Sequence, residues 1–168
     1  DDPSVVVGLP EVNLGVIPGA GGTQRLPRLI GIPAALEILV QGKTMRAPKA
    51  VGAGLVDAVA DTPEEVMEAA RAWIAAHPFG QQPWDRSEPP PGPGPGAAEA
   101  RNLYMAGCAM LFKKTAGAFA APEAVIAVVQ EGLRLSFDRG MEVEARAFAR
   151  LATSDQAKDM IRTFWYHR

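Results

Sequence analysis

Seven prolines fall within residues 78–96, "PFGQQPWDRSEPPPGPGPG", and this cluster constrains the fold more than any other feature of the sequence. Proline fixes φ and lacks the N–H group that helices and central strands require. We therefore expect residues 78–96 to be an extended Pro/Gly-rich connector. The connector divides the chain of 168 residues into three predicted parts, residues 1–77, 78–96 and 97–168.

The composition is that of an ordinary globular protein, with 48% hydrophobic and 21% charged residues. The net charge of -2 does not indicate a nucleic-acid-binding protein. No apolar run approaches the length that spans a bilayer. The N-terminus lacks the pattern of a signal peptide, so we expect a cytoplasmic protein. The single cysteine, Cys108, lies in the apolar stretch "YMAGCAMLF" and is predicted to be a buried packing residue.

Residues 1–77 are predicted to begin with a strand and continue mainly as helices. The β-branched run "SVVVGLP" predicts the strand. Helical spacing then runs from Gly21 or Gly22 to Gly31, and again through "IPAALEILVQGK" to the stop at Gly42. We expect a turn over "TMR", a short helix from about Ala47 and a strand in "LVDAVA".

The last helix before the connector has a capping pattern, with Thr62 followed by Pro63 and by Glu65 three residues after the threonine. His77 is expected to cap its end. Beyond the connector, the spacing predicts helices over residues 97–117, 122–140, 141–154 and 155–168, with Ser154 or Asp155 capping the last. The charged residues of "DRGMEVEARAFAR" are expected to form a solvated helix face.

The stretch "VNLGVIPGAGGTQRL" is a glycine-rich turn that leads into a helix. It lacks the third glycine of a dinucleotide fingerprint, since Gln24 stands there, and "QGKT" lacks the first glycine of a P-loop, since Glu37 stands there. A backbone role remains, in which free N–H groups at the helix start face a ligand. Glu11 lies eight residues before Gly19, and a carboxylate facing such amides can hold a water or a proton. On spacing alone, a solvated surface glutamate is the alternative.

Taken whole, "GLPEVNLGVIPGAGGTQRLPRLIG" resembles the crotonase family of enoyl-CoA hydratases and isomerases. The following "ALEILVQGKTMRAPKAVGAGLVDAVA" is similar to the family's next segment. The later "KKTAGAFAAPEAVIAVVQEG" and "FDRGMEVEARAFARLATS" resemble the multifunctional fatty-acid oxidation enzymes, in which the hydratase is joined to a 3-hydroxyacyl-CoA dehydrogenase. The resemblance implies an α/β fold, the crotonase-like (ClpP/crotonase) spiral of ββα units. This chain would be its mostly helical C-terminal part, with residues 97–168 leading toward the dehydrogenase domain.

The resemblance also implies an activity, the addition of water across the 2,3-double bond of a 2-enoyl-CoA in fatty-acid β-oxidation. It assigns Glu11 as the acid that gives a proton to C2, and Gly19 as the residue whose N–H places the attacking water. An acyl-CoA would be the substrate. We expect no cofactor and no metal in this chain, because NAD would belong to a dehydrogenase domain and His167 has no partner at ligand spacing.

The family's other catalytic glutamate and its oxyanion donors lie upstream of the "PE" segment, in a part that this chain does not contain. We therefore expect a piece of a longer enzyme that is inactive alone, with the N-terminal crotonase half and the dehydrogenase domain as partners and a thiolase subunit as a further candidate. Glu11 alone does not separate a hydratase from an isomerase. A non-catalytic docking scaffold formed by residues 97–168 is the alternative from another class.

Overall fold

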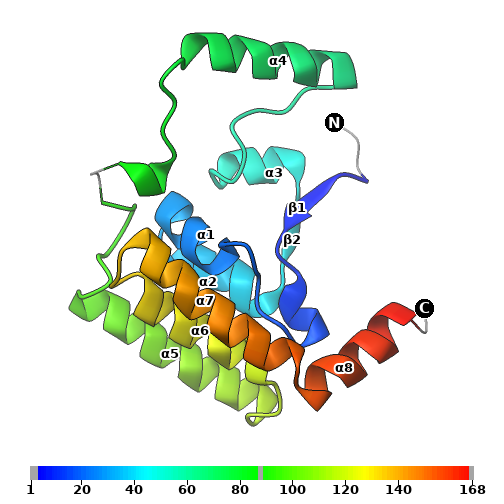
Figure 1. The fold of residues 1–168 in the computed structure, drawn as a ribbon, viewed down its shortest axis with the longest axis vertical. Coiled ribbons are helices and arrows are strands. Elements are labelled where there is room, and N and C mark those ends of the chain that lie inside the picture. The colour runs from blue at the N-terminus through cyan, green and yellow to red at the C-terminus, as the bar shows by residue number, and fades with distance from the viewer. Residues whose placement is uncertain (1–3, 87–88, 167–168) are drawn as a thin grey trace.

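Helices make up most of this computed structural model, which describes residues 4–86 and 89–166 (Figure 1). The mostly helical character expected from the sequence is confirmed. Five helices pack together in the lower half of Figure 1: α1 (Gly22–Ile30), α2 (Ile32–Gln41), α5 (Ala98–Thr115), α6 (Ala120–Gly132) and α7 (Phe137–Ala152). Their core is aliphatic, and its fully buried side chains include Ile17, Ile32, Leu39, Val125 and Ile126. Each such side chain contributes about 1.5–3 kcal/mol through its removal from water.

One small antiparallel sheet joins β1 (Val6–Gly8) to β2 (Thr44–Arg46), with Val6 opposite Arg46. The strand predicted in "SVVVGLP" is confirmed, but the turn predicted over "TMR" is wrong, because this segment pairs with a strand far away in the sequence. The strand predicted in "LVDAVA" is also wrong. Residues 55–60 form bends and irregular chain, and no described strand lies beside them to complete a ladder.

Two predictions around the glycine stops are confirmed. Gly42 ends α2 in the left-handed conformation with a φ of 60°, and the short helix α3 (Ala47–Gly52) begins where expected. The helix predicted over residues 122–140 is instead two elements. α6 ends at Gly132, and the hydroxyl oxygen of Ser136 accepts a hydrogen bond from the Arg139 amide to begin α7.

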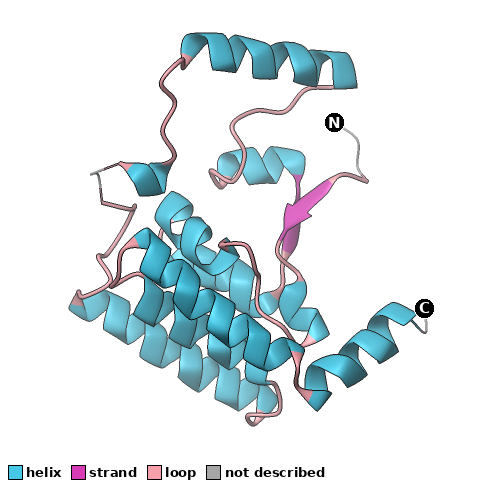
Figure 2. Cartoon of the chain, in the orientation of Figure 1, coloured by secondary structure: helices cyan, strands magenta, loops and turns pink. Residues whose placement is uncertain are grey.

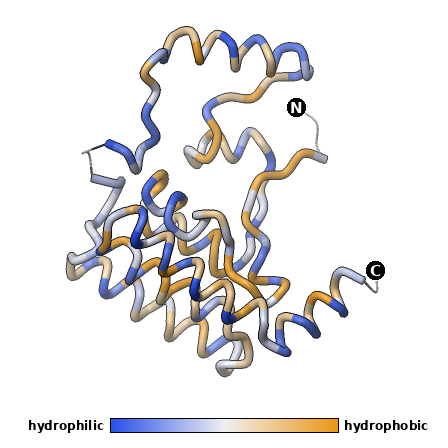
Figure 3. Tube along the Cα trace, viewed as in Figure 1, coloured by the Kyte–Doolittle hydropathy of each residue, from blue (hydrophilic) through white to orange (hydrophobic). Residues whose placement is uncertain are grey.

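Helix α4 (Pro63–Ala76) lies apart from the packed helices, at the top of Figure 1. Its predicted capping box is confirmed, since the Thr62 hydroxyl accepts from the Glu65 amide and the Glu65 carboxylate accepts from the Thr62 amide. His77 is the C-cap residue, as expected, and its Nδ1 atom lies 2.9 Å from the Trp73 carbonyl oxygen while the two rings stack. None of the α4 residues is buried, and Figure 3 shows apolar and polar residues following one another along it.

The connector has one short helical turn, η2 (Pro83–Asp85), and is otherwise loop where it is described (Figure 2). The division of the chain at residues 78–96 stays a prediction. The connector is nevertheless anchored, because the Trp84 ring stacks on Phe137 at 5.6 Å between ring centroids. The Arg25 guanidinium lies over the same two rings, at 5.3 Å and 5.8 Å from their centroids.

Near the C-terminus, Ser154 caps α8 (Asp155–Ile161) as predicted, and a π-type turn, η3 (Arg162–Tyr166), follows. The prediction of a buried Cys108 is wrong, since the cysteine is exposed on α5. The inward stripe of that helix consists of Ala100, Tyr104 and Leu111, and Cys108 lies beside it. His167 lies outside the described residues. No described helix has the length and the apolar character needed to cross a membrane.

Candidate functional site

Glu11 begins a 3-10 turn, η1 (Glu11–Leu14), separated from the end of β1 by two residues. The turn closes at Gly15, whose φ of 76° favours glycine and which packs against Ala157 of α8. The Glu11 side chain is half-buried, and its Oε2 atom is removed from solvent. Within the described residues this oxygen has no hydrogen-bond partner. A buried polar atom left unpartnered costs about 1–3 kcal/mol, so this oxygen is the strongest mark of a ligand site near the predicted residues.

The glycine-rich turn from Gly19 to Gly21 adopts a left-handed path, with φ of 53° at Ala20 and 94° at Gly21. The Gly19 carbonyl accepts a hydrogen bond of 3.2 Å from the Gly22 amide, where α1 begins. The Gly19 amide donates to none of the other residues that the structure describes. The predicted water-holding N–H group is therefore unoccupied by the protein's own acceptors.

The other amides at the start of α1 are not open to a ligand. Glu144 of α7 accepts hydrogen bonds from the Gly21 amide at 2.6 Å, from the Thr23 amide at 2.9 Å and from the Thr23 hydroxyl at 2.6 Å. Its side chain is buried, so the expectation of a fully solvated charged face in "DRGMEVEARAFAR" is wrong at this residue. The expectation that the helix start faces a ligand with all its amides is wrong for Gly21 and Thr23.

Glu144 is the residue that sequence reasoning missed. Met141, Glu144 and Phe148 recur at helical spacing, and this face of α7 covers the glycine turn. A methyl group added at Gly19 would lie 3.5 Å from the Phe148 ring, and one added at Gly21 would lie 2.9 Å from the Met141 sulfur. Glu144 lies between Met141 and Phe148 on this face, and an acidic residue on an otherwise apolar helix face was the sequence signal that indicated a buried role.

Residues 1–78 match the family model described as enoyl-CoA hydratase/isomerase. The matched region contains Glu11, Gly19 and the start of α1, and it supports the crotonase-like fold class expected for the chain. It ends where the connector begins. The resemblance of residues 97–168 to multifunctional enzymes therefore stays a prediction.

Two solved structures are similar to the chain, both from Geobacillus kaustophilus HTA426. One is an enoyl-CoA hydratase that is 24% identical, with 97% of this chain and 47% of that chain covered and a TM-score of 0.39. The other is described as enoyl-CoA hydratase subunit I, other form, and is 31% identical, with 97% and 49% covered and a TM-score of 0.38. The chain spans about half the length of these two proteins.

Behind the glycine turn, α1 carries a second polar group, the buried Gln24 and the half-buried Arg28. Gln24 donates to the Val128 carbonyl of α6 at 3.4 Å, and Arg28 donates to the Gln24 side chain at 3.0 Å and to the Gly132 carbonyl at 3.2 Å. Burial lowers the pKa of Arg28 below its usual value. These contacts fix α1 against α6, and so they fix the position of the turn that precedes α1.

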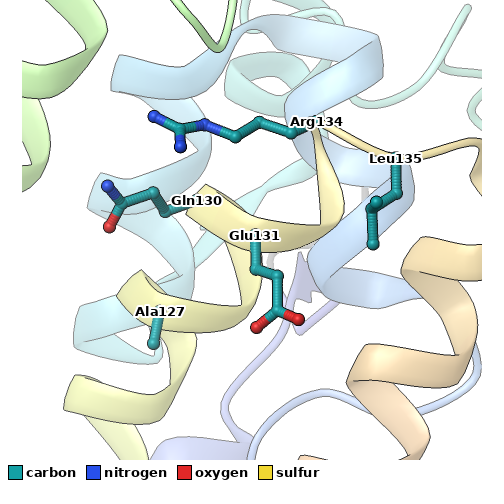
Figure 4. A pocket seen from close by; sticks show the side chains of 5 residues that line it. All are labelled: Ala127, Gln130, Glu131, Arg134 and Leu135. Atoms are coloured by element: carbon teal, nitrogen blue, oxygen red, sulfur yellow. The ribbon is translucent and has the colours of Figure 1, made fainter.

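A hollow of about 410 Å³ does not contain the predicted residues. It is lined by Ala127, Gln130, Glu131, Arg134 and Leu135, all from α6 or the turn after it. Figure 4 shows Gln130 and Arg134 pointing to one side of α6 and Glu131 pointing away from them. Because these polar groups do not converge, the hollow is a poor candidate for a catalytic site.

The two predicted site residues would offer one carboxylate, from Glu11, and one backbone amide, from Gly19. Glu11 and Gly19 make no hydrogen bond with each other in the described structure. A group of three or more His, Cys, Asp or Glu side chains suited to a metal is absent from the described part of the chain.

Proposed function

We propose that this chain supplies Glu11 and Gly19 to the active site of a crotonase-type enzyme that hydrates 2-enoyl-CoA. The observation that carries the proposal is the buried, unpartnered Oε2 atom of Glu11, in a region that matches the enoyl-CoA hydratase/isomerase model. A carboxyl group in such a place gains a partner when substrate or water arrives.

In the proposed reaction, a second carboxylate of the longer protein takes a proton from water while the water oxygen bonds to C3. Glu11 gives a proton to C2, and the Gly19 amide holds the water before it attacks. N–H donors aimed at the thioester oxygen stabilise the enolate between the two steps, and each such donor contributes about 3–4 kcal/mol. The second carboxylate and these donors would come from the part of the enzyme outside this chain, so we propose that the chain alone is inactive.

The test is Glu11→Gln in the full-length gene product, with hydration of crotonyl-CoA as the assay. Loss of a general acid typically lowers the rate by about 100-fold to 10,000-fold, and we expect kcat to fall by at least about 100-fold. Glu37→Gln is the matched control, because Glu37 is an exposed glutamate paired with Lys43. A Glu11→Gln enzyme as active as the control would refute the assignment.

An isomerase is the closest alternative, since the matched family description covers both activities. In that reaction Glu11 would carry a proton between C2 and C4 without the entry of water. Assay of a 3-enoyl-CoA beside a 2-enoyl-CoA separates the two activities, because only a hydratase turns the 2-enoyl substrate into a 3-hydroxyacyl product.

The wider setting is also a proposal. We place the enzyme in fatty-acid β-oxidation in the cytoplasm, with residues 97–168 leading to an NAD-dependent 3-hydroxyacyl-CoA dehydrogenase domain and with a thiolase subunit as a possible partner. The aromatic residues of η3 favour a docking role for this end of the chain, because Trp165 is 68% exposed and Tyr166 75% exposed. The full-length gene sequence tests this setting, since it either encodes the dehydrogenase domain or does not.

A further inference from the structure

We propose that Glu144 is a positioning residue for the hydration reaction, which holds the Gly19–Gly21 turn in the shape that presents the Gly19 amide. The inference rests on the proposed function, because it assigns Glu144 a task in the same site. Glu144 does not touch the predicted reacting atoms and acts through the turn.

Three hydrogen bonds connect the Glu144 carboxylate to Gly21 at the end of this turn and to Thr23 in the first turn of α1. Its Oε1 atom accepts from the Gly21 amide at 2.6 Å, and its Oε2 atom accepts from both the amide and the hydroxyl of Thr23. The side chain is 2% exposed, so water does not replace these bonds. Bonds to an ionised acceptor are about twice as strong as neutral ones, and a negative charge is stabilised at a helix N-terminus.

The turn needs such support because its own backbone conformation is unfavourable. Ala20 has a positive φ of 53°, a backbone conformation that residues other than glycine rarely adopt. The Arg25 guanidinium also supports the turn, because it donates to the Ala20 carbonyl at 2.9 Å. Glu144 and Arg25 therefore both hold the turn, and Gly19 is its first residue, whose amide donates to no other described residue.

If Glu144 only capped α1, it would make the same hydrogen bonds, but its loss would not change the rate of the reaction. Residues 4–86 and 89–166 contain no Lys or Arg that forms an ion pair with Glu144, so its carboxylate is held by the Gly21 amide and by the amide and hydroxyl of Thr23. A neutral amide in its place would direct an NH2 group at one of the donors. The turn would then relax while the aliphatic core stays intact.

The test compares Glu144→Gln with Glu142→Gln in the full-length gene product. Glu142 lies on the same helix but is exposed and pairs with Arg139 and Arg146, so its variant removes the same charge away from the turn. The first readout is amide hydrogen exchange, which does not depend on activity. We expect Gly21 and Thr23 to exchange at least about tenfold faster in Glu144→Gln than in Glu142→Gln.

The second readout is the kinetics of crotonyl-CoA hydration. Misplacement of a catalytic group by about 1 Å can cost about 100-fold, so we expect kcat of Glu144→Gln to fall by at least about tenfold with KM within about twofold. If Glu144→Gln does not fold, Thr23→Val removes one donor of the same cluster. Thr23→Ser is its matched control, because serine keeps the hydroxyl, and we expect it to retain the kcat that Thr23→Val loses.

Equal exchange in Glu144→Gln and Glu142→Gln would overturn the inference. So would faster exchange with unchanged kcat, in an enzyme that Glu11→Gln inactivates, because the turn would then move without consequence for the reaction. Absence of hydration by the unaltered protein would refute the proposed function and the catalytic part of this inference. The exchange measurement would still decide whether Glu144 holds the turn.

Discussion

Gly140 lies at a tight crossing of α6 and α7, and its replacement by alanine gives a sharp test of the packing. A Cβ atom there would overlap Oε1 of Gln24 and lie 3.0 Å from the Gly132 carbonyl oxygen. The carbonyl belongs to the backbone of α6 and cannot rotate away. The Gln24 side chain can yield only by giving up its bond from Arg28.

The magnitude follows from three opposing effects. Alanine in place of glycine inside a helix stabilises by about 1 kcal/mol. Overpacking of a tight contact costs about 1–3 kcal/mol, and a buried polar group left without its partner costs about 1–3 kcal/mol more. We therefore expect Gly140→Ala to lower the free energy of unfolding by about 1–5 kcal/mol, which for a chain of this size lowers Tm by about 2–4 °C per kcal/mol.

The assay is urea and thermal unfolding, with Gly52→Ala as the control. Gly52 is also helical, and nothing lies within 4 Å of a Cβ added there. Its variant should be neutral or slightly stabilised, by up to about 1 kcal/mol. If Gly140→Ala were stabilised as much as the control, the close approach of α7 to Gln24 would be wrong.

Three further predictions concern other parts of the chain. Thr62→Ala removes the capping box and should weaken α4 by about 1 kcal/mol, seen as faster hydrogen exchange in that helix alone, because none of its residues is buried. Burial raises the pKa of Tyr104, so the folded state favours the protonated phenol. The resulting contribution to the free energy of unfolding is complete below the unfolded pKa of about 10 and is lost as pH rises through the folded pKa. Tyr104→Phe should therefore flatten the fall of the urea midpoint between about pH 9 and 11, and an unchanged slope would contradict the burial of its hydroxyl. Cys108 is exposed, so it should react with a thiol reagent in the folded protein as fast as in urea, whereas protection would mean that this face of α5 is covered.

The sequence predicted best where the signal is local. Gly42 ends a helix, and Thr62 and Glu65 form a capping box. Both act through hydrogen bonds within a few residues, so the local sequence was enough to predict them. Ser154 is of the same kind, since its hydroxyl accepts from an amide three residues away.

The errors arose where distant segments decide the structure. The segment "TMR" is a strand because β1 lies beside it, and "LVDAVA" is not a strand because it has no described neighbour. Gly132 ends α6 where α1 inserts Gln24 between two helices, which no local pattern indicates. Glu144 is the clearest case, because its partners Gly21 and Thr23 lie more than a hundred residues away in the sequence.

The central claim is that the Glu11 carboxylate and the Gly19 amide share one substrate site. The most direct measurement is a structure of the full-length gene product with a bound 3-hydroxyacyl-CoA. We predict that Oε2 of Glu11 then lies within contact of C2, and that the Gly19 amide lies about 2.6–3.2 Å from the oxygen on C3 or from a water in its place. A thioester bound elsewhere, with Oε2 of Glu11 still unpartnered, would contradict the account.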